Sequence, residues 1–348
     1  MIDKIRLSDF RNFNSRLIEF SENITVIVGH NAVGKTNILE SIFLLSTGKS
    51  FKAKVEEEMI NYKKDIGRVK GKIGETKLEV ILTRGIIDIG RGQPEKVSRK
   101  RVFVNGVAKR LIDFAGNFKV VLFGPWDMDL VTESPSLRRK FLDNVLSQVD
   151  REYRRCILSY EKGLRQRNKL LFRIREEGLS RSQLIFWNQL LIKNGDYISN
   201  KRQEFIDFVN SQPNLNDKNI KLEYDKSAIS EGRLEQYKNE EIYAGTTLVG
   251  PHRDDFIFKN DGRDLSSYGS RGEQRMGILW VKLAELSFIE SVTGERPTLL
   301  LDDIFSELDD IHRDIVMKVA NDQQTIITTA DKHEFSVLIS KKVNEIKL

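Results

Sequence analysis

The sequence predicts an α/β fold in which an α+β head is built from both ends of the chain and a mainly helical lobe is inserted between them. Residues 1–130 consist mostly of short β-branched and aromatic runs broken by Gly and Asn, which indicates strands. Apolar residues then recur at helical spacing up to residue 211, and strand and helix patterns alternate from residue 246 onward. The predicted division is a head of residues 1–133 and 246–348 and a lobe of residues 134–245.

The N-terminal part of the head is expected to be rich in strands and to contain one helix. That helix begins at Gly34 and carries apolar residues at helical spacing through Leu45. The clearest strands are runs of β-branched and aromatic residues: Ile24–Val28, Leu78–Leu82 and Val102–Gly106.

The lobe is expected to begin at Ser134-Pro135, where an N-cap residue precedes a proline at the first helical position. Apolar residues at intervals of three, four or seven predict one long helix from there through Ile174. A second helix is expected over residues 182–211, and strand character resumes near Ile220.

Composition restricts the class of protein. The chain has 348 residues, 39% of them hydrophobic, which is enough for one large domain or two ordinary ones. A net charge of +6 and a pI of about 9.1 favour polyanionic partners. The single cysteine, Cys156, excludes an internal disulfide and a multi-cysteine zinc site. The sequence shows no signal peptide and no membrane span, so we expect a cytoplasmic protein.

A phosphate-binding loop is predicted directly after the strand Ile24–Val28. The segment fits G-x-x-x-x-G-K-[ST] and precedes a helix, so its amides and glycines can wrap phosphates. Lys35 is expected to reach the β- and γ-phosphates of ATP and to act in catalysis, and Thr36 to ligate Mg²⁺. A glycine-rich turn without a ligand is the alternative. The predicted ATP-binding residues are Gly29, His30, Asn31, Ala32, Val33, Gly34, Lys35 and Thr36.

A second nucleotide element is predicted far downstream. The apolar run Thr298–Leu301 ends in Asp302 and Asp303, as expected where a buried parallel strand delivers acids to its carboxyl end. Asp302 would hold Mg²⁺ and Asp303 would polarise the attacking water. Paired acids at this position could instead cap a helix.

Two further segments predict an ABC-type ATPase. A serine and glycine amides at a helix start can bind a γ-phosphate from the opposite subunit, although such a stretch is often only an N-cap. The predicted signature residues are Ser270, Arg271, Gly272, Glu273 and Gln274. Ser306 and Asp309 lie just beyond the paired acids, where ABC proteins carry their D-loop.

On these motifs the chain resembles the RecF family of recombination mediator ATPases with an SMC-like head. The resemblance runs nearly end to end. It includes the N-terminal Leu7–Phe13 with Arg11 and Asn12, and the segments Pro135–Asp143, Gln166–Asn168 and Gly250–Asp255. The last of these has no chemical role that its residue types reveal.

The resemblance implies a function for the whole chain. In RecF-like proteins ATP lies between two heads, so each site needs Lys35 of one subunit and Ser270 of the other. Dimerisation would then depend on ATP, with Arg11 and Asn12 among the ATP-binding residues. The family also implies binding to gapped, duplex and single-stranded DNA, and action with RecR to load RecA onto strands coated by single-strand-binding protein.

The lobe carries the excess positive charge. Residues 138–181 contain 13 Lys or Arg and six acids, a net charge of +7 against +6 for the whole chain. Such a face can bind DNA phosphates without reading sequence, although a solvated basic face is the alternative. The candidate DNA-binding residues are Arg138, Arg139, Arg151, Arg154, Arg155, Arg165 and Lys169.

Three other functions compete with this interpretation. An ABC-type nucleotide-binding subunit of a transporter or another complex is disfavoured because the expected glutamine and histidine switch residues are missing after Phe123 and Thr329. A nuclease is disfavoured because no D-x-D cluster follows Asp303. A DNA-binding module with a vestigial P-loop remains open, but Lys35, Thr36, Asp302 and Asp303 are all intact. Slow, regulatory ATP hydrolysis is therefore expected.

Overall fold

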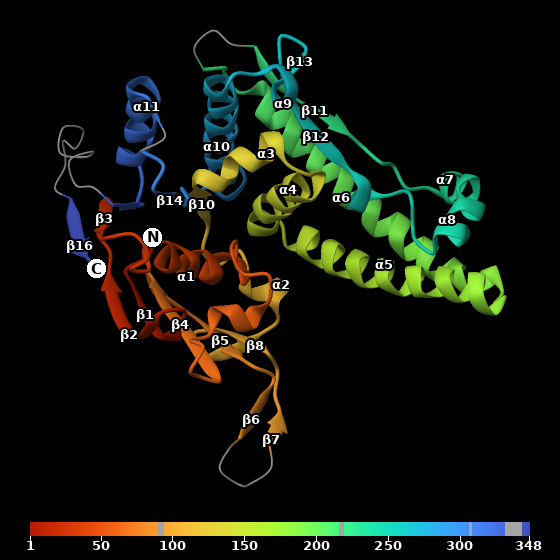
Figure 1. Ribbon diagram of the computed structural model, residues 1–348, viewed down its shortest axis with the longest axis horizontal. Helices are drawn as coiled ribbons and strands as arrows, with labels where there is room; N and C mark the ends of the chain where they lie inside the picture. The colour runs from red at the N-terminus through yellow and green to blue at the C-terminus, as the bar shows by residue number, and fades with distance from the viewer. Residues whose placement is uncertain (89–93, 216–218, 306–307, 331–342) are drawn as a thin grey trace. The chain divides into compact units, whose positions relative to one another are not determined.

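The computed structural model describes residues 1–88, 94–215, 219–305, 308–330 and 343–348. The chain forms two compact units, one of Met1–Asp127 with Ile289–Leu348 and the other of Met128–Phe288 (Figure 1). Within the described ranges, no helix is long and apolar enough to cross a membrane.

The first unit contains an antiparallel sheet of six strands in the order β2-β1-β4-β5-β8-β9. Buried and exposed residues alternate along β4, so one face of the sheet lies on the core and the other faces solvent. The strands are β1 (Lys4–Phe10), β2 (Phe13–Glu19), β4 (Ile66–Ile73), β5 (Thr76–Thr83), β8 (Lys100–Val104) and β9 (Val107–Lys109). A separate pair consists of β6 (Ile86–Asp88) and β7 (Pro94–Lys96).

The same unit contains a parallel sheet in the order β10-β14-β15-β3-β16. Four of its strands are buried along their whole length, which explains why they consist almost entirely of β-branched and apolar residues. The strands are β3 (Ile24–Val28), β10 (Val120–Phe123), β14 (Thr298–Asp302), β15 (Thr325–Thr329) and β16 (Asn344–Lys347). Because they are parallel, their carboxyl ends meet at one edge, where ligands bind in open α/β sheets.

Helix α1 (Lys35–Thr47) is buried between the two sheets. Its apolar side chains share one core with Leu7 of β1, Val80 of β5, and Leu300 and Ile326 of the parallel strands. This three-layer packing fixes the start of α1 beside the edge where β3 and β14 end. The unit also contains α2 (Leu111–Phe114) and α11 (Asp310–Asn321).

The second unit is mainly helical. Figure 1 shows α5 (Arg151–Glu177) and α6 (Ile185–Ser211) side by side, with α7 (Glu231–Gln236) and α8 (Lys238–Ala244) beside their far ends. A small antiparallel sheet joins β11 (Ile220–Asp225), β12 (Asp255–Asn260) and β13 (Arg263–Asp264). The remaining helices are α3 (Asp129–Thr132), α4 (Pro135–Val149), α9 (Leu265–Tyr268) and α10 (Arg271–Thr293), whose last residues belong to the first unit.

The prediction of one long helix from Ser134 to Ile174 is wrong, because the chain breaks at Asp150 into α4 and α5. Asp150 has an extended backbone, and its carboxylate accepts hydrogen bonds from the amides of Glu152 and Tyr153. An aspartate N-cap starts a new helix in this way while the apolar spacing continues across the break.

The division between the units also differs from the predicted one at its second boundary. Residues 246–288, which we expected in the head, belong to the second unit. The reason is long-range pairing: β12 pairs with β11 along its whole length, from Ile220 with Asn260 to Asp225 with Asp255. The first boundary, after Asp127, lies within a few residues of the expected position.

Candidate functional site

The loop between β3 and α1 follows a path that its small residues permit. Ala32 and Gly34 have φ values of 68° and 112°, in the left-handed region. A Cβ atom at Gly34 would lie 2.7 Å from the Asn12 side chain, so glycine is required there. The loop turns directly into α1, whose first amides have no acceptor within the helix and are available to an anion.

Lys35 is held against this loop. Its side chain is buried, and its ammonium group donates hydrogen bonds to the carbonyl oxygens of Gly29 at 2.6 Å and His30 at 3.1 Å. The Lys35 ammonium group therefore lies at the loop that the sequence predicts to hold phosphates. Its N–H groups can exchange the carbonyl oxygens for phosphate oxygens.

Thr36 and Asp302 are 266 positions apart in sequence and meet at the carboxyl edge of the parallel sheet. The Thr36 hydroxyl donates to Asp302 Oδ2 at 2.8 Å, and Thr328 donates to Asp302 Oδ1 at 2.5 Å. The pKa of the Asp302 carboxyl is raised, because the effect of burial exceeds that of the hydrogen bonds from Thr328 and Thr36, which lower it. The Thr36 hydroxyl and the Asp302 carboxylate both provide hard oxygen donors of the kind that Mg²⁺ prefers.

Asp303 follows β14 in a left-handed conformation with φ of 51°, which is unfavourable for a residue with a side chain. Its amide donates to the carbonyl of Thr328 at 3.1 Å, which ties the end of β14 to β15. Strained backbone of this kind persists where the surrounding structure fixes it, often at functional sites. Thr328 was not predicted as part of the site, because it is one of three threonines in β15 and belongs to no recognisable motif.

Arg11 and Asn12 lie beside the loop in different roles. The Arg11 guanidinium donates to both carboxylate oxygens of the buried Glu40, at 2.7 and 2.6 Å, and to the Glu58 carbonyl at 2.6 Å. Asn12 donates to the Val33 carbonyl at 2.8 Å. Asn12 thus contacts the loop itself, whereas Arg11 pairs with Glu40 and the Glu58 carbonyl, which hold the turn that carries Asn12.

Ser270 caps the N-terminus of α10. Its hydroxyl accepts from the amide of Glu273 at 3.3 Å, and the Glu273 carboxylate accepts from the Ser270 amide at 3.0 Å, which forms a reciprocal capping box. Both Ser270 and Gly272 are exposed, and a Cβ atom at Gly272 would meet no atom within 4 Å. Arg271 is exposed as well, whereas Gln274 is buried and donates to the Leu265 carbonyl at 2.9 Å. The helix start is therefore open as well as capped.

Of the two predicted D-loop residues, Ser306 lies outside the described residues. Asp309 is exposed and caps α11, because its carboxylate accepts from the His312 amide at 2.9 Å. The contact with that amide lowers the pKa of the Asp309 carboxyl. Within its own chain, Asp309 therefore acts as the N-cap of α11.

Two of the cations proposed for DNA are used inside the second unit. Arg138 is buried and pairs with both oxygens of Asp255, at 2.7 and 2.9 Å. Arg139 donates to the carbonyl of Asp254 at 2.9 Å. We therefore remove Arg138 and Arg139 from the candidate DNA contacts, because their donors hold α4 against the start of β12.

The other candidates lie on α5. Arg154 donates to the Ser147 carbonyl at 2.5 Å, and Arg155 pairs with Glu152 on its own helix. The exposed members of the set are Arg151, Arg155, Arg165 and Lys169. These four keep cationic groups at the surface, where a phosphate backbone could reach them.

The segment Gly250–Asp255 forms the centre of a buried polar network in the second unit. Asp254 is fully buried, and its carboxylate accepts from Arg202 at 3.0 Å, Ser199 at 3.0 Å, the Ser227 amide at 2.8 Å and the Tyr224 hydroxyl. A charge buried in this way is tolerated because each oxygen has partners. The role that the sequence left open is structural: the segment ties α6 and β11 to β12.

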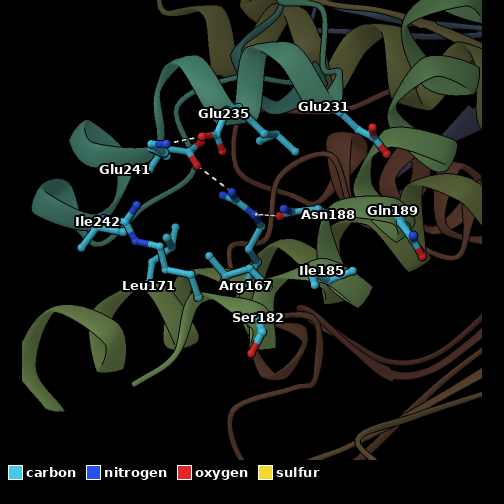
Figure 2. A pocket seen from close by; sticks show the side chains of 14 residues that line it. Arg167, Leu171, Ser182, Ile185, Asn188, Gln189, Glu231, Glu235, Glu241 and Ile242 are labelled. Atoms are coloured by element: carbon cyan, nitrogen blue, oxygen red, sulfur yellow. Dashed lines mark hydrogen bonds and ion pairs between the residues drawn. The ribbon is translucent and has the colours of Figure 1, made fainter. Parts of the chain in front are cut away.

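Gln166–Asn168 has a similar structural role at the other end of the helices. Figure 2 shows the Arg167 guanidinium directed at Glu241 and Asn188 across a pocket of about 450 Å³. Arg167 donates to Glu241 at 2.6 Å, to Asn188 at 2.8 Å and to Thr247 at 2.8 Å. These bonds fasten α5 to α6, to α8 and to the segment that follows α8.

His252 predicts a pH dependence of stability. Its Nε2 lies 3.0 Å from the Thr247 carbonyl, which can only accept, so Nε2 carries the proton and Nδ1 accepts from the Tyr160 hydroxyl at 2.8 Å. Burial, and to a smaller extent the charges of Arg253 and Arg139, lower the pKa of His252 from 6.5 to about 4. The unfolded chain binds the proton more tightly, so stability present above pH 6.5 is lost as the pH falls toward 4, by up to about 3 kcal/mol.

Urea unfolding between pH 4 and 7.5 measures this effect against the His252→Gln variant. Glutamine can keep one donor and one acceptor but does not titrate, so the variant should show a flatter dependence between pH 4 and 6.5. Identical slopes for the two proteins would contradict the assignment.

Taken together, the parallel sheet, the loop at its carboxyl edge and the Thr36–Asp302 contact define an ABC-type ATPase head. Two solved structures share this fold over nearly the whole chain, both described as the recombination mediator protein RecF in the RecFOR pathway. The RecF-ATPrS structure has a TM-score of 0.86 and 31% identity, covering 99% of this chain and 96% of that chain. The RecF-ATP structure has a TM-score of 0.85 and 32% identity, covering 95% and 92%.

Sequence comparisons agree with the fold. The model of the RecF/RecN/SMC N terminal domain matches residues 1–346. The DNA replication and repair protein RecF of Halothermothrix orenii is 36% identical over 371 residues, covering 100% of this chain and 96% of that protein. The protein of the same name from Ligilactobacillus salivarius is 34% identical over 355 residues, covering 94% and 90%. The chain belongs to the RecF family.

Proposed function

We propose that this chain binds ATP at residues 29–36 and hydrolyses it slowly. The observation that carries the proposal is the 2.8 Å contact between Thr36 and Asp302, which joins the helix start to the strand end at the edge where ligands bind in such sheets. Lys35 lies at the same loop, where it can bind the β- and γ-phosphates. The solved RecF relatives that carry ATP or ATPrS in their names support this ligand.

Mg²⁺ would be held by the Thr36 hydroxyl and, directly or through water, by the Asp302 carboxylate. Both are hard oxygen donors, and such sites commonly take their remaining ligands from waters and substrate phosphates. Consistently, the described residues contain no group of three or more His, Cys, Asp or Glu placed to hold a metal unaided. When bound, the ion would neutralise charge on the phosphates.

Asp303 is the residue proposed to orient the attacking water. A bond forms between the water oxygen and the γ-phosphorus while the bond between the γ-phosphorus and the β–γ bridging oxygen breaks. The water gives up a proton, and ADP and phosphate are released. The switch residues of transporters are missing at the ends of β10 and β15, which supports slow hydrolysis that times a dimer.

ATP is proposed to pair two copies of the chain head to head. Each site would combine Lys35 of one protomer with Ser270 of its partner, because Ser270 and Gly272 are exposed at the start of α10, where a helix N-terminus favours a γ-phosphate. The dimer is proposed to bind DNA through its backbone, using Arg151, Arg155 and other exposed cations.

A role in DNA repair follows from the family. The names of the relatives describe DNA replication and repair and the RecFOR pathway, which supports action with RecR. An indirect role with RecA and single-strand-binding protein is proposed from the family resemblance. We propose that the protein acts in the cytoplasm.

Replacement of Ser270 tests the composite site. Ser270→Arg should leave ATP affinity of the monomer unchanged and abolish ATP-induced association measured by light scattering, because the bulky cation blocks the partner's phosphate. The variant also loses the helix cap, at about 1 kcal/mol of stability. Ser270→Asp keeps the cap but repels the γ-phosphate, so it should be equally defective in association. Loss of ATP affinity in either monomer would place Ser270 in its own protomer's site.

A further inference from the structure

The solvent face of the antiparallel sheet in the first unit is strongly basic. Strand register places its side chains in rows across β1, β4 and β5. Lys4 lies opposite Lys72, which lies opposite Lys77, and Arg6 lies opposite Lys70. We call the set Lys4, Arg6, Arg68, Lys70, Lys72 and Lys77 the basic sheet face.

This pattern is unfavourable for stability alone. Like charges directly opposite each other on neighbouring strands destabilise a sheet. Charged residues often protect sheet edges from aggregation, but β1, β4 and β5 are interior strands, and the edges here are β2 and β9. Protection of an edge therefore does not explain the lysines of the central strands.

Acidic partners only partly compensate the charge. Glu79 lies 3.2 Å from Arg68 and 3.5 Å from Lys70, so one carboxylate is shared by two cations. Lys72 pairs with Asp3 at 3.2 Å, with both side chains 42% exposed. Exposed pairs of this kind are weak and easily exchanged for another anion. Within the described ranges, Arg6 and Lys77 have no carboxylate at ion-pairing distance.

The face is hollowed and regularly spaced. The six residues of the basic sheet face all line one groove of about 540 Å³, in which Glu79 is the only acidic residue among the described side chains. Alternate residues along a strand are about 6.8 Å apart and neighbouring strands about 4.8 Å apart. The cations therefore form a two-dimensional array. An extended chain of evenly spaced negative charges can contact several of them at once, whereas a single compact anion cannot.

We propose that the basic sheet face binds the phosphate backbone of DNA, as a contact surface separate from the cations of α5. The proposal rests on the proposed DNA-binding function and assigns it a second set of residues. Backbone contacts of this type are independent of base sequence and depend strongly on salt. Bound DNA phosphates would then offset the repulsion between cations on neighbouring strands.

The test is the variant Arg6→Gln, Lys70→Gln, Lys72→Gln, in the full-length chain. Its control is Lys54→Gln, Lys109→Gln, Lys318→Gln, which removes the same charge from exposed positions outside the groove. Fluorescence anisotropy measures binding to a single-stranded and to a duplex oligonucleotide over a range of salt concentration. Thermal unfolding checks that both variants fold, and neutralisation of the facing cations should not lower the melting temperature.

The sheet variant should bind DNA at least tenfold more weakly than the control, and the slope of log affinity against log salt should fall by about 2–3 for three lost contacts. Loss for one oligonucleotide only would identify the strand form that the face binds. Equal binding by variant and control overturns the inference while leaving DNA binding intact. A wild-type chain that binds neither oligonucleotide overturns the proposed DNA function as well. The same two variants are compared for binding to phosphatidylserine vesicles. If the sheet variant loses vesicle binding but keeps DNA binding, the face binds a membrane and the inference is also overturned.

Discussion

Lys35→Met is expected to weaken ATP binding by about 10–100-fold, because a charged hydrogen-bonding partner of the phosphates contributes about 1.5–3 kcal/mol. The variant should stay monomeric when ATP is added. The position of the side chain supports an effect of this size: Lys35 is buried against the loop and already donates to the Gly29 and His30 carbonyls. Isothermal titration calorimetry and light scattering measure the two effects.

Lys52→Met is the matched control for this substitution. Lys52 is exposed and lies close to α1, the helix that begins with Lys35, where it donates to Asn37 at 3.4 Å. Removing it takes away the same charge and should leave ATP affinity and ATP-induced association unchanged. Normal association of the Lys35→Met chain would show that the loop is not the site through which ATP acts.

Asp254→Ala is expected to lower the free energy of unfolding of the second unit by about 3–5 kcal/mol, because it leaves a buried cation without its partner. Arg202 is 1% exposed and keeps only part of its compensation, from Asp143 at 2.8 Å. The substitution also removes the acceptor for Ser199, Tyr224 and the Ser227 amide.

Urea unfolding followed by tryptophan fluorescence measures this loss, since Trp187 and Trp280 both lie in the second unit. Asp225→Ala is the control, an exposed aspartate on β11 beside Tyr224, and it should change stability by no more than about 0.5 kcal/mol. Equal stabilities of the two variants would mean that the buried network does not hold the second unit together.

The parts of the site that the sequence predicted are those encoded by contiguous residues. The phosphate-binding loop lies within residues 29–36, and its flanking strand and helix are confirmed by β3 and α1. The carboxylates at the end of β14 follow a buried apolar run, a local signal of the same kind. The helices of the lobe were also visible from spacing, apart from the break at Asp150.

The parts that could not be predicted depend on contacts between residues distant in sequence. Arg11 was expected to bind ATP, and only the fold shows that it also pairs with Glu40 and the Glu58 carbonyl. Arg138 reads as a surface cation until Asp255, 117 positions away, is placed beside it. The basic sheet face was missed for the same reason, because strand register aligns its lysines and no single segment contains them.

The composite site is tested most directly by mixing two defective chains. Lys35→Met and Ser270→Arg should each remain at the monomer mass of 40.2 kDa when ATP is added. In a mixed dimer, one site combines the intact Lys35 of one chain with the intact Ser270 of the other, while the second site carries both defects. The mixture should therefore recover ATP-induced dimers, measured by light scattering coupled to size-exclusion chromatography. A mixture that stays monomeric, or a single variant that dimerises alone, would contradict a site shared between two copies of this chain.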